Sequence, residues 1–410
     1  MFDEVERDIG AIRLPRWGRV ERAAGVVAWD VLDDGGTPVE PIRRYLTDFV
    51  AQGNSQASVR SYAYALLRWW RWLRAVDVDW DKATPAECRD LVLWLQANLK
   101  TRRSPRTKSL ATAGTINPIT RKRYLDDNYA IRTIRHSNAV VRAFYGYWIE
   151  IGQGPLINPV PLKGRGRPHA HHNRLEQFRP EGRIRYNPKL PKRQPREITD
   201  DQWHRLFAVL RSNRDRALLA LVISTAARAQ ETLGIKPADL DWGDQRVCVI
   251  RKGTRAEQWL PASSEAFVWL RIYIADMGEL FDSNAPLWRT LRRRDHGTGL
   301  HRQHLSYDAL RKVLIRANDA LGTNWTMHDL RHTAALRMSR DEHLSDRDIQ
   351  TILGHAHLST TAETYLVEEQ AEVIRRVKRF LDDRQTPTDP QTPVDAGYDS
   401  SDLDVLFGRS

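Results

Sequence analysis

The sequence is short of cysteine, and it has no long apolar run. Its two cysteines, Cys88 and Cys248, lie far apart and within apolar stretches. Such thiols are typical of buried, reduced side chains in a reducing compartment, and they exclude a disulfide framework. No apolar run reaches the length of a membrane span, and acidic residues precede the first apolar stretch at the N-terminus. We therefore expect a cytoplasmic protein without a membrane partner.

Acidic side chains are too few to balance the basic ones. The 410 residues include 64 Lys and Arg against 52 Asp and Glu, which gives a formal net charge of +12. Lysine is scarce as well, since only 11 of the 64 basic residues are lysines. A cationic excess favours a polyanionic partner, and a guanidinium group binds phosphate through two hydrogen bonds at once. A GC-rich genome would give the same preference for arginine, so composition leaves both explanations open.

The length allows two or three domains. Residues 1–37 mix charge, glycine and short apolar runs, and we assign no role to them. Helical patterns extend over 38–155, and aromatic residues recur on one of these helices at three- to four-residue spacing. We interpret Trp69, Trp70 and Trp72 as packing residues rather than as residues that stack on bases.

Two basic segments accompany the helical pattern. The first is an insertion at 100–127 within the helical domain, and the second is a linker at 156–196 that is rich in proline and glycine. Basic segments of this kind bind the phosphate backbone of DNA, although a solvated connector has the same composition. The candidate DNA-binding residues are Arg102, Arg103, Arg106, Arg165, Arg167 and Arg193.

A second domain is predicted over 197–383. Thr199 can cap the first of two helices, and the second of them is almost wholly apolar, as expected for a core helix. Strands are predicted at 246–250 and 258–260. The predicted fold class is therefore mainly α with a small β-hairpin or sheet, divided into a helical domain and a mixed α/β domain. An acidic tail at 384–410 is rich in Pro, Thr and Asp, and we expect it to be disordered.

The stretch from Thr326 to Tyr365 has the most readable local signals. Thr326 and Ser345 can each cap a short helix, and an acidic residue follows each of them in the first turn of that helix. Gly354 suits the left-handed residue that ends the second helix. A histidine follows directly, and the tyrosine comes ten residues after that histidine.

The histidines on the first of these helices allow two interpretations. His328 and Arg331 are three residues apart and share a face of the helix, which makes a cationic, hydrogen-bonding surface. His328 and His332 are four apart, a spacing also found in zinc enzymes. Arg331 would repel a metal ion bound there, and Asp329 stands where a zinc protease needs glutamate. We therefore predict no metal site, and a packing or hydrogen-bonding role for His332.

The segments HDLRHT and LGH, followed by Tyr365, resemble the tyrosine recombinase, or phage integrase, family. Two upstream segments extend the resemblance: STAARAQETLGI, which contains Arg228, and VCVIRKGTRAEQWLP, which contains Lys252. The resemblance is close over about 195–383 and general over 38–151. The chain departs from the family pattern in Ala226-Ala227, where many relatives have a glycine, and in a ten-residue step to the tyrosine, where many have nine.

The resemblance implies a site that cleaves DNA strands without a metal or a nucleotide cofactor. Cleavage places charge on phosphate oxygens, which calls for cations, and it expels an alkoxide, which calls for a proton. Tyr365 would form the phosphotyrosine, Lys252 would protonate the leaving 5′ oxygen, and Glu231 would orient Arg228 through an ion pair. The residues implied as catalytic are Arg228, Lys252, His328, Arg331, His355 and Tyr365, and the supporting residues are Glu231 and His332.

The implied protein is a site-specific DNA recombinase of the integrase or transposase type that works through a 3′-phosphotyrosine. Its helical, SAM-like core-binding domain and its catalytic domain would enclose double-stranded DNA, and it would act as a homotetramer on synapsed sites. Accessory recombination proteins are further candidate partners, and a DNA-associated protein of prokaryotic or phage origin is expected. Two alternatives stay open, a type IB topoisomerase that relaxes DNA and a non-catalytic DNA-binding regulator. The sequence does not identify the target site. It also does not tell integration, transposition and resolution apart.

Overall fold

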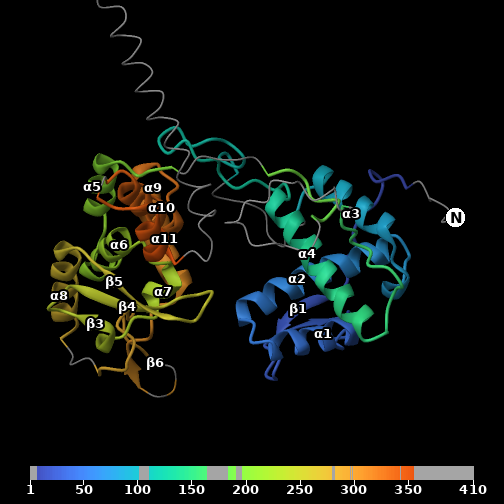
Figure 1. Ribbon diagram of the computed structural model, residues 1–410, viewed down its shortest axis with the longest axis horizontal. Helices are drawn as coiled ribbons and strands as arrows, with labels where there is room; N and C mark the ends of the chain where they lie inside the picture. Colours follow the sequence, from blue (N-terminus) through green and yellow to red (C-terminus); the bar gives the residue numbers. More distant parts are fainter. Residues whose placement is uncertain are drawn as a thin grey trace, which may run out of the picture. The chain divides into compact units, whose positions relative to one another are not determined.

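The computed structural model divides the chain into two compact units (Figure 1). The first comprises Met1–Asn117 and Arg121–Lys192, and the second comprises Pro118–Thr120 and Arg193–Ser410. The residues that the structure describes are 7–100, 110–163, 183–190, 196–278, 282–295, 297, 299–341 and 343–354. Within these ranges, no helix is both long and apolar enough to cross a membrane.

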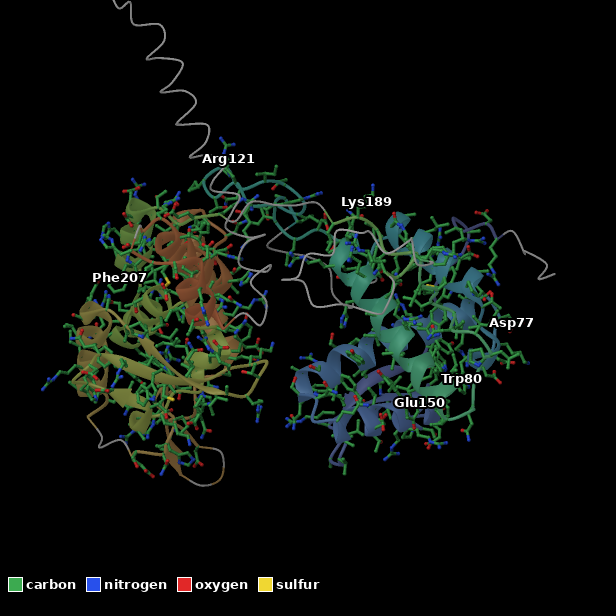
Figure 2. All side chains as sticks on the ribbon, viewed as in Figure 1. Asp77, Trp80, Arg121, Glu150, Lys189 and Phe207 are labelled. Atoms are coloured by element: carbon green, nitrogen blue, oxygen red, sulfur yellow. The ribbon has the colours of Figure 1, made fainter. Side chains whose placement is uncertain are left out.

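Four α-helices and an aromatic core form the described part of the first unit. The three tryptophans interpreted as packing residues are indeed buried, with exposed fractions of 1% (Trp69), 8% (Trp70) and 0% (Trp72). Trp80, labelled in Figure 2, lies against the same core, with its ring 5.0 Å from that of Trp148. The helices are α1 (Glu40–Ala51), α2 (Gln56–Ala75), α3 (Pro85–Ala97) and α4 (Ile131–Glu150), with a short 3-10 helix η1 (Trp80–Lys82).

The N-terminal residues, for which the sequence predicts no role, belong to this core. Strands β1 (Arg19–Arg22) and β2 (Trp29–Leu32) pair antiparallel, and they bury Val20 and Val31 among the side chains of the helices. Arg7 donates to two acidic residues of α3, Glu87 at 2.6 Å and Asp90 at 3.0 Å. Residues 7–37 are therefore a structural part of the first unit.

The second unit combines seven α-helices with small antiparallel sheets in its described part. The helices are α5 (Asp200–Ala208), α6 (Asn213–Thr225), α7 (Ala229–Leu233), α8 (Ser264–Met277), α9 (Tyr307–Leu321), α10 (Met327–Ser339) and α11 (Asp346–Leu353), with a 3-10 helix η2 (Pro237–Asp239). One sheet has the order β3 (Leu240–Asp241), β4 (Arg246–Ile250) and β5 (Glu257–Pro261), and a second consists of β6 (Arg294–Asp295) and β7 (Leu300–His301). The predicted fold class, mainly helical with a small sheet, is confirmed.

Local signals for helix ends are confirmed in this unit. Thr199 accepts a hydrogen bond from the backbone of Gln202 and closes the capping box before α5. Helix α6 is buried through most of its length, as its apolar sequence predicts. It ends at Ala226, whose φ of +54° lies in the left-handed region that favours glycine.

The two cysteines differ in their surroundings. Cys88 is buried in the first unit, and burial raises the pKa of its thiol to about 12. Cys248 is only partly buried, so the expectation of two buried thiols is wrong for it. The reason is strand alternation, since Val247 and Val249 take the buried face of β4 and Cys248 takes the other face. Neither thiol forms a disulfide.

Candidate active site

The first arginine of the site stands at the start of a helix. Arg228 is the N-cap residue of α7, two residues after the left-handed Ala226. Its backbone N–H donates to Glu231 at 2.9 Å, and its guanidinium donates to the other carboxylate oxygen of Glu231 at 2.8 Å. The expected ion pair is therefore present. One third of the Arg228 side chain is exposed, so part of its guanidinium remains accessible from solvent.

Glu231 is the hub of the site. Its side chain is 1% exposed, and its carboxylate accepts four hydrogen bonds, two from Arg228, one from Arg251 and one from the backbone of Lys252. Burial by itself would raise the pKa of Glu231, but the hydrogen bonds from Arg228 and Lys252 outweigh burial and hold the pKa below its ordinary value. A charged carboxylate thus joins the start of α7 to the hairpin.

Lys252 begins the turn that connects β4 to β5. Its backbone N–H donates to Glu231 at 3.1 Å, while its side chain is exposed. The turn is closed below the lysine by a hydrogen bond of 2.9 Å from the backbone of Arg251 to that of Ala256. The predicted hairpin is confirmed, with Glu257–Pro261 as its second strand. It presents the Lys252 amine at the surface of the site.

Arg251 is a buried arginine that the sequence motifs do not single out. Its side chain is 4% exposed and lies 3.0 Å from a Glu231 oxygen. It also donates to the Gln258 side chain at 2.7 Å and to the carbonyl of Ile352 on α11. Burial lowers the pKa of this guanidinium, and the Glu231 carboxylate opposes that change. The one signal in the sequence is spacing, since Arg251 follows the buried Val249 at the two-residue period of a strand.

Arg331 lies on α10 with both terminal nitrogens on backbone carbonyls. One donates to Ala226 at 2.5 Å and the other to Leu353 at 2.6 Å, and the residue is 5% exposed. The structure thus brings Arg331 to the end of α6 and the end of α11, and Arg228 follows α6 after two residues. Helix α10 packs against both α6 and α11 (Figure 1).

The two histidines of α10 contact each other. Thr326 and Asp329 form the expected capping box at the start of the helix, with the Thr326 backbone donating to Asp329 at 2.7 Å. One turn in, the Nε2 atoms of His328 and His332 are 2.8 Å apart. One of these nitrogens must carry the proton that the other accepts. His332 therefore hydrogen-bonds His328, in keeping with the supporting role expected of it.

Part of the predicted site lies outside the described residues. The structure ends its description at Gly354, so His355 and Tyr365 are not placed. The tail at 384–410, predicted to be disordered, also lies outside the described residues. The same is true of the candidate DNA-binding residues, which are Arg102, Arg103, Arg106, Arg165, Arg167 and Arg193. Of the predicted catalytic residues, four are placed: Arg228, Lys252, His328 and Arg331.

An N-cap arginine, a hairpin lysine and a helix with His and Arg three residues apart, in this order, define a catalytic unit of the tyrosine recombinase type. Family comparison agrees, because the model of the phage integrase family matches residues 196–372. The model of the phage integrase N-terminal SAM-like domain matches residues 42–113. The chain therefore belongs to the phage integrase family.

Individual relatives are distant. The tyrosine recombinase XerA of Pyrococcus horikoshii is 27% identical over 176 residues, which are 43% of this chain and 58% of that protein. Transposase A from transposon Tn554 of Staphylococcus aureus is 21% identical over 371 residues, which are 87% of this chain and 94% of that protein. A lambda integrase (75–356) dimer bound to a COC′ core site has a TM-score of 0.50 at 14% identity, over 79% of this chain and 93% of that one. This last likeness concerns the fold.

Proposed function

We propose that this chain is a site-specific DNA recombinase of the integrase or transposase type. It cleaves and rejoins strands of double-stranded DNA through a 3′-phosphotyrosine at Tyr365, and its chemistry needs no metal. The observation that carries the proposal is the cationic site organised by Glu231, whose buried carboxylate accepts hydrogen bonds from the guanidinium of Arg228 and from the backbone N–H of Lys252, whose side chain is exposed. Such preorganised donors stabilise the charge that develops on a phosphate in the transition state.

Each placed residue suits one part of the reaction. The guanidinium groups of Arg228 and Arg331 bind the non-bridging oxygens of the phosphate. The side chain of Arg228 is one third exposed. The exposed amine of Lys252 protonates the leaving 5′ oxygen. His328 hydrogen-bonds the same phosphate, and His332 holds the His328 ring through their shared hydrogen bond. His355 completes this set from the residue after Gly354.

The test of this proposal is covalent trapping. Tyr365→Phe removes the phenol oxygen and leaves the cationic site unchanged, so we expect DNA binding to persist and covalent protein–DNA adducts to disappear. Adducts are measured by denaturing electrophoresis of the protein with nicked duplex DNA, in excess EDTA. Tyr398→Phe, at the only tyrosine after Tyr365, is the matched control and should form adducts at the wild-type yield. Adducts from Tyr365→Phe at normal yield would assign the nucleophile to another residue.

The assembly is part of the same proposal. The match to the Tn554 transposase covers 87% of this chain and 94% of that protein, which supports a DNA-rearranging role. We propose that the protein acts as a homotetramer on two synapsed duplexes, with accessory recombination proteins as further partners. A substrate with two target sites separates this role from DNA relaxation, because a recombinase gives recombinant joints and a type IB topoisomerase gives relaxed circles only.

A further inference from the structure

The end of α11 is held by side chains from β5, from the β4–β5 turn and from α10. An α-helix leaves its last four carbonyls without partners inside the helix. Three of them accept side-chain donors here: Thr351 from Gln258 of β5 at 2.9 Å, Ile352 from Arg251, and Leu353 from Arg331 of α10. Two positive guanidinium groups thus lie at the negative pole of the helix.

Arg251 also contacts Glu231. Its three guanidinium nitrogens bond three different partners, Gln258, Glu231 and the carbonyl of Ile352. The side chain therefore joins the base of the hairpin turn to the carboxylate that holds Arg228, and both of them to α11. Burial of a guanidinium is costly, and this full set of partners compensates it.

The fit between Arg251 and α11 is close. Gly354 ends α11 at φ +58°, and a Cβ atom built on it would lie 2.9 Å from Nε of Arg251. The glycine thus serves both the left-handed backbone and the approach of the guanidinium. His355 is the next residue in the chain. Arg251 thus contacts both the hairpin and the residue that precedes His355.

The position of Lys252 depends on this attachment. Its amine is at the end of a flexible stem on an exposed turn, and among the described residues no ion pair holds it. What sets its place is the backbone of the turn, which is fixed by the hydrogen bond from the Lys252 N–H to Glu231 and by the anchored side chain of the preceding residue.

We propose that Arg251 is a positioning residue for cleavage, which locks the hairpin base between Glu231 and the end of α11 and so aims Lys252 at the leaving oxygen. It does not touch DNA. The inference rests on the proposed function. It also assigns a role to a buried arginine that the sequence motifs do not point to. Loss of Arg251 should therefore resemble loss of Lys252 more than loss of a phosphate-binding arginine.

The test uses the leaving group. Arg251→Met keeps length and apolar bulk and removes the donors. The substrate is a duplex containing the site mapped from adducts of the wild-type protein, made with either oxygen or sulfur at the bridging 5′ position of the scissile phosphate. A thiolate leaves without a proton, so sulfur removes the need for a general acid. We expect Arg251→Met to form adducts at least about tenfold more slowly on oxygen DNA, which is less than the roughly 10²–10⁴-fold effect of a general acid because Lys252 is displaced and not removed. Most of that loss should be recovered on sulfur DNA. In a Lys252→Ala background, Arg251→Met should add no further loss on oxygen DNA.

A matched control separates positioning from stability. Ser345→Ala removes the cap at the start of α11 and leaves the hydrogen bonds of Arg251 and Glu231 in place, so its adduct rates should change by the same factor on both substrates. If Arg251→Met does not fold, as judged by thermal unfolding, Arg251→Lys is read on the same two substrates, with the same expectation because an ammonium cannot bond all three partners.

The outcomes are distinct. Wild-type rates on oxygen DNA, or equal slowing on both substrates, would overturn the role of Arg251 while leaving the proposed function intact. Absence of adducts from the wild-type protein would instead remove the proposed function, and the role of Arg251 with it.

Discussion

Arg228 and Arg331 occupy the same site but depend on it differently. The Arg228 side chain is one third exposed and shares its carboxylate partner with Arg251. Arg331 is buried and donates to the carbonyls of Ala226 and Leu353. Removal of Arg228 leaves Glu231 paired with Arg251. Removal of Arg331 deprives two buried carbonyls of a hydrogen-bond donor.

We predict from this contrast that Arg331→Ala destabilises the second unit by at least about 2 kcal/mol, because each buried group that loses its partner costs about 1–3 kcal/mol. Arg228→Ala should cost less than about 1 kcal/mol, the usual range for a partly exposed ion pair. The measurement is urea denaturation of both variants beside the wild-type protein. Both variants should cleave at least about 10²-fold more slowly. Equal stability of the two would mean that Arg331 does not support the end of α11.

Ala226 shows how a residue can depart from a family pattern and still keep the backbone. An alanine in the left-handed region is strained by roughly 1–2 kcal/mol relative to the right-handed helix. Here the residue is fully buried, its methyl group packs in the cluster with Ala334 and Leu353, and its carbonyl bonds Arg331. These interactions offset the strain. The departure from glycine therefore leaves Arg228 in place at the start of α7.

At the scale of elements, α11 is short and depends on its ends. It has eight residues, too few for a stable isolated helix. A capping box from Ser345 to Asp348 supports its start, and donors from β5, the β4–β5 turn and α10 support its end. Gly354, which caps the end of α11, is thus the position where a substitution should disturb this helix most.

We predict that Gly354→Ala is more harmful than Gly278→Ala, although both glycines end a helix with nearly the same φ, +58° and +60°. Gly278 has open space where a Cβ would go, so alanine there should cost only the strain of about 1–2 kcal/mol. At Gly354 the new atom would also displace Arg251. Thermal unfolding and adduct formation measure both effects, and adduct formation should fall for Gly354→Ala only. Similar losses of stability would show that the guanidinium moves aside freely.

Helix ends were predictable from the sequence because their partners lie within a few residues. The capping boxes at Thr199, Thr326 and Ser345 each join a residue to one three positions ahead, and the glycine after α11 is a similarly local signal. The same holds for the pair of Arg228 with Glu231, and for the period that buries the tryptophans of α2.

Long-range interactions were not predictable in this way. Arg251 is 101 residues away from its partner Ile352, and Arg7 is 80 residues away from Glu87. A charged side chain in a sequence is ordinarily a solvated one, and only the packing of distant elements buries these two with their partners. The buried hub around Glu231 and the place of the N-terminal residues therefore became visible in the structure alone.

At the scale of the whole molecule, the net charge of +12 governs DNA affinity. Binding to phosphates releases counterions, so log affinity falls linearly with log salt concentration. We predict that replacing Arg102, Arg103 and Arg106 by glutamine flattens this slope by roughly 1 unit for each phosphate that the variant no longer binds. The slope is measured by fluorescence anisotropy with duplex DNA across a salt series. Arg205→Gln is the control, because that arginine is paired with a carboxylate of its own helix, and its slope should match the wild type. An unchanged slope for the triple variant would make the insertion at 100–127 a spacer.

The N-terminal strand pair decides where a self-sufficient piece of this protein can be cut. A fragment that starts at α1, where the helical pattern begins, would leave the apolar partners of Val20 and Val31 facing water. It would also deprive the acids Glu87 and Asp90 of the guanidinium of Arg7. Such a fragment would tend to aggregate and to be degraded, for reasons unrelated to DNA binding. The N-terminal boundary of a stable first unit is therefore at or before Arg7, well ahead of its first helix.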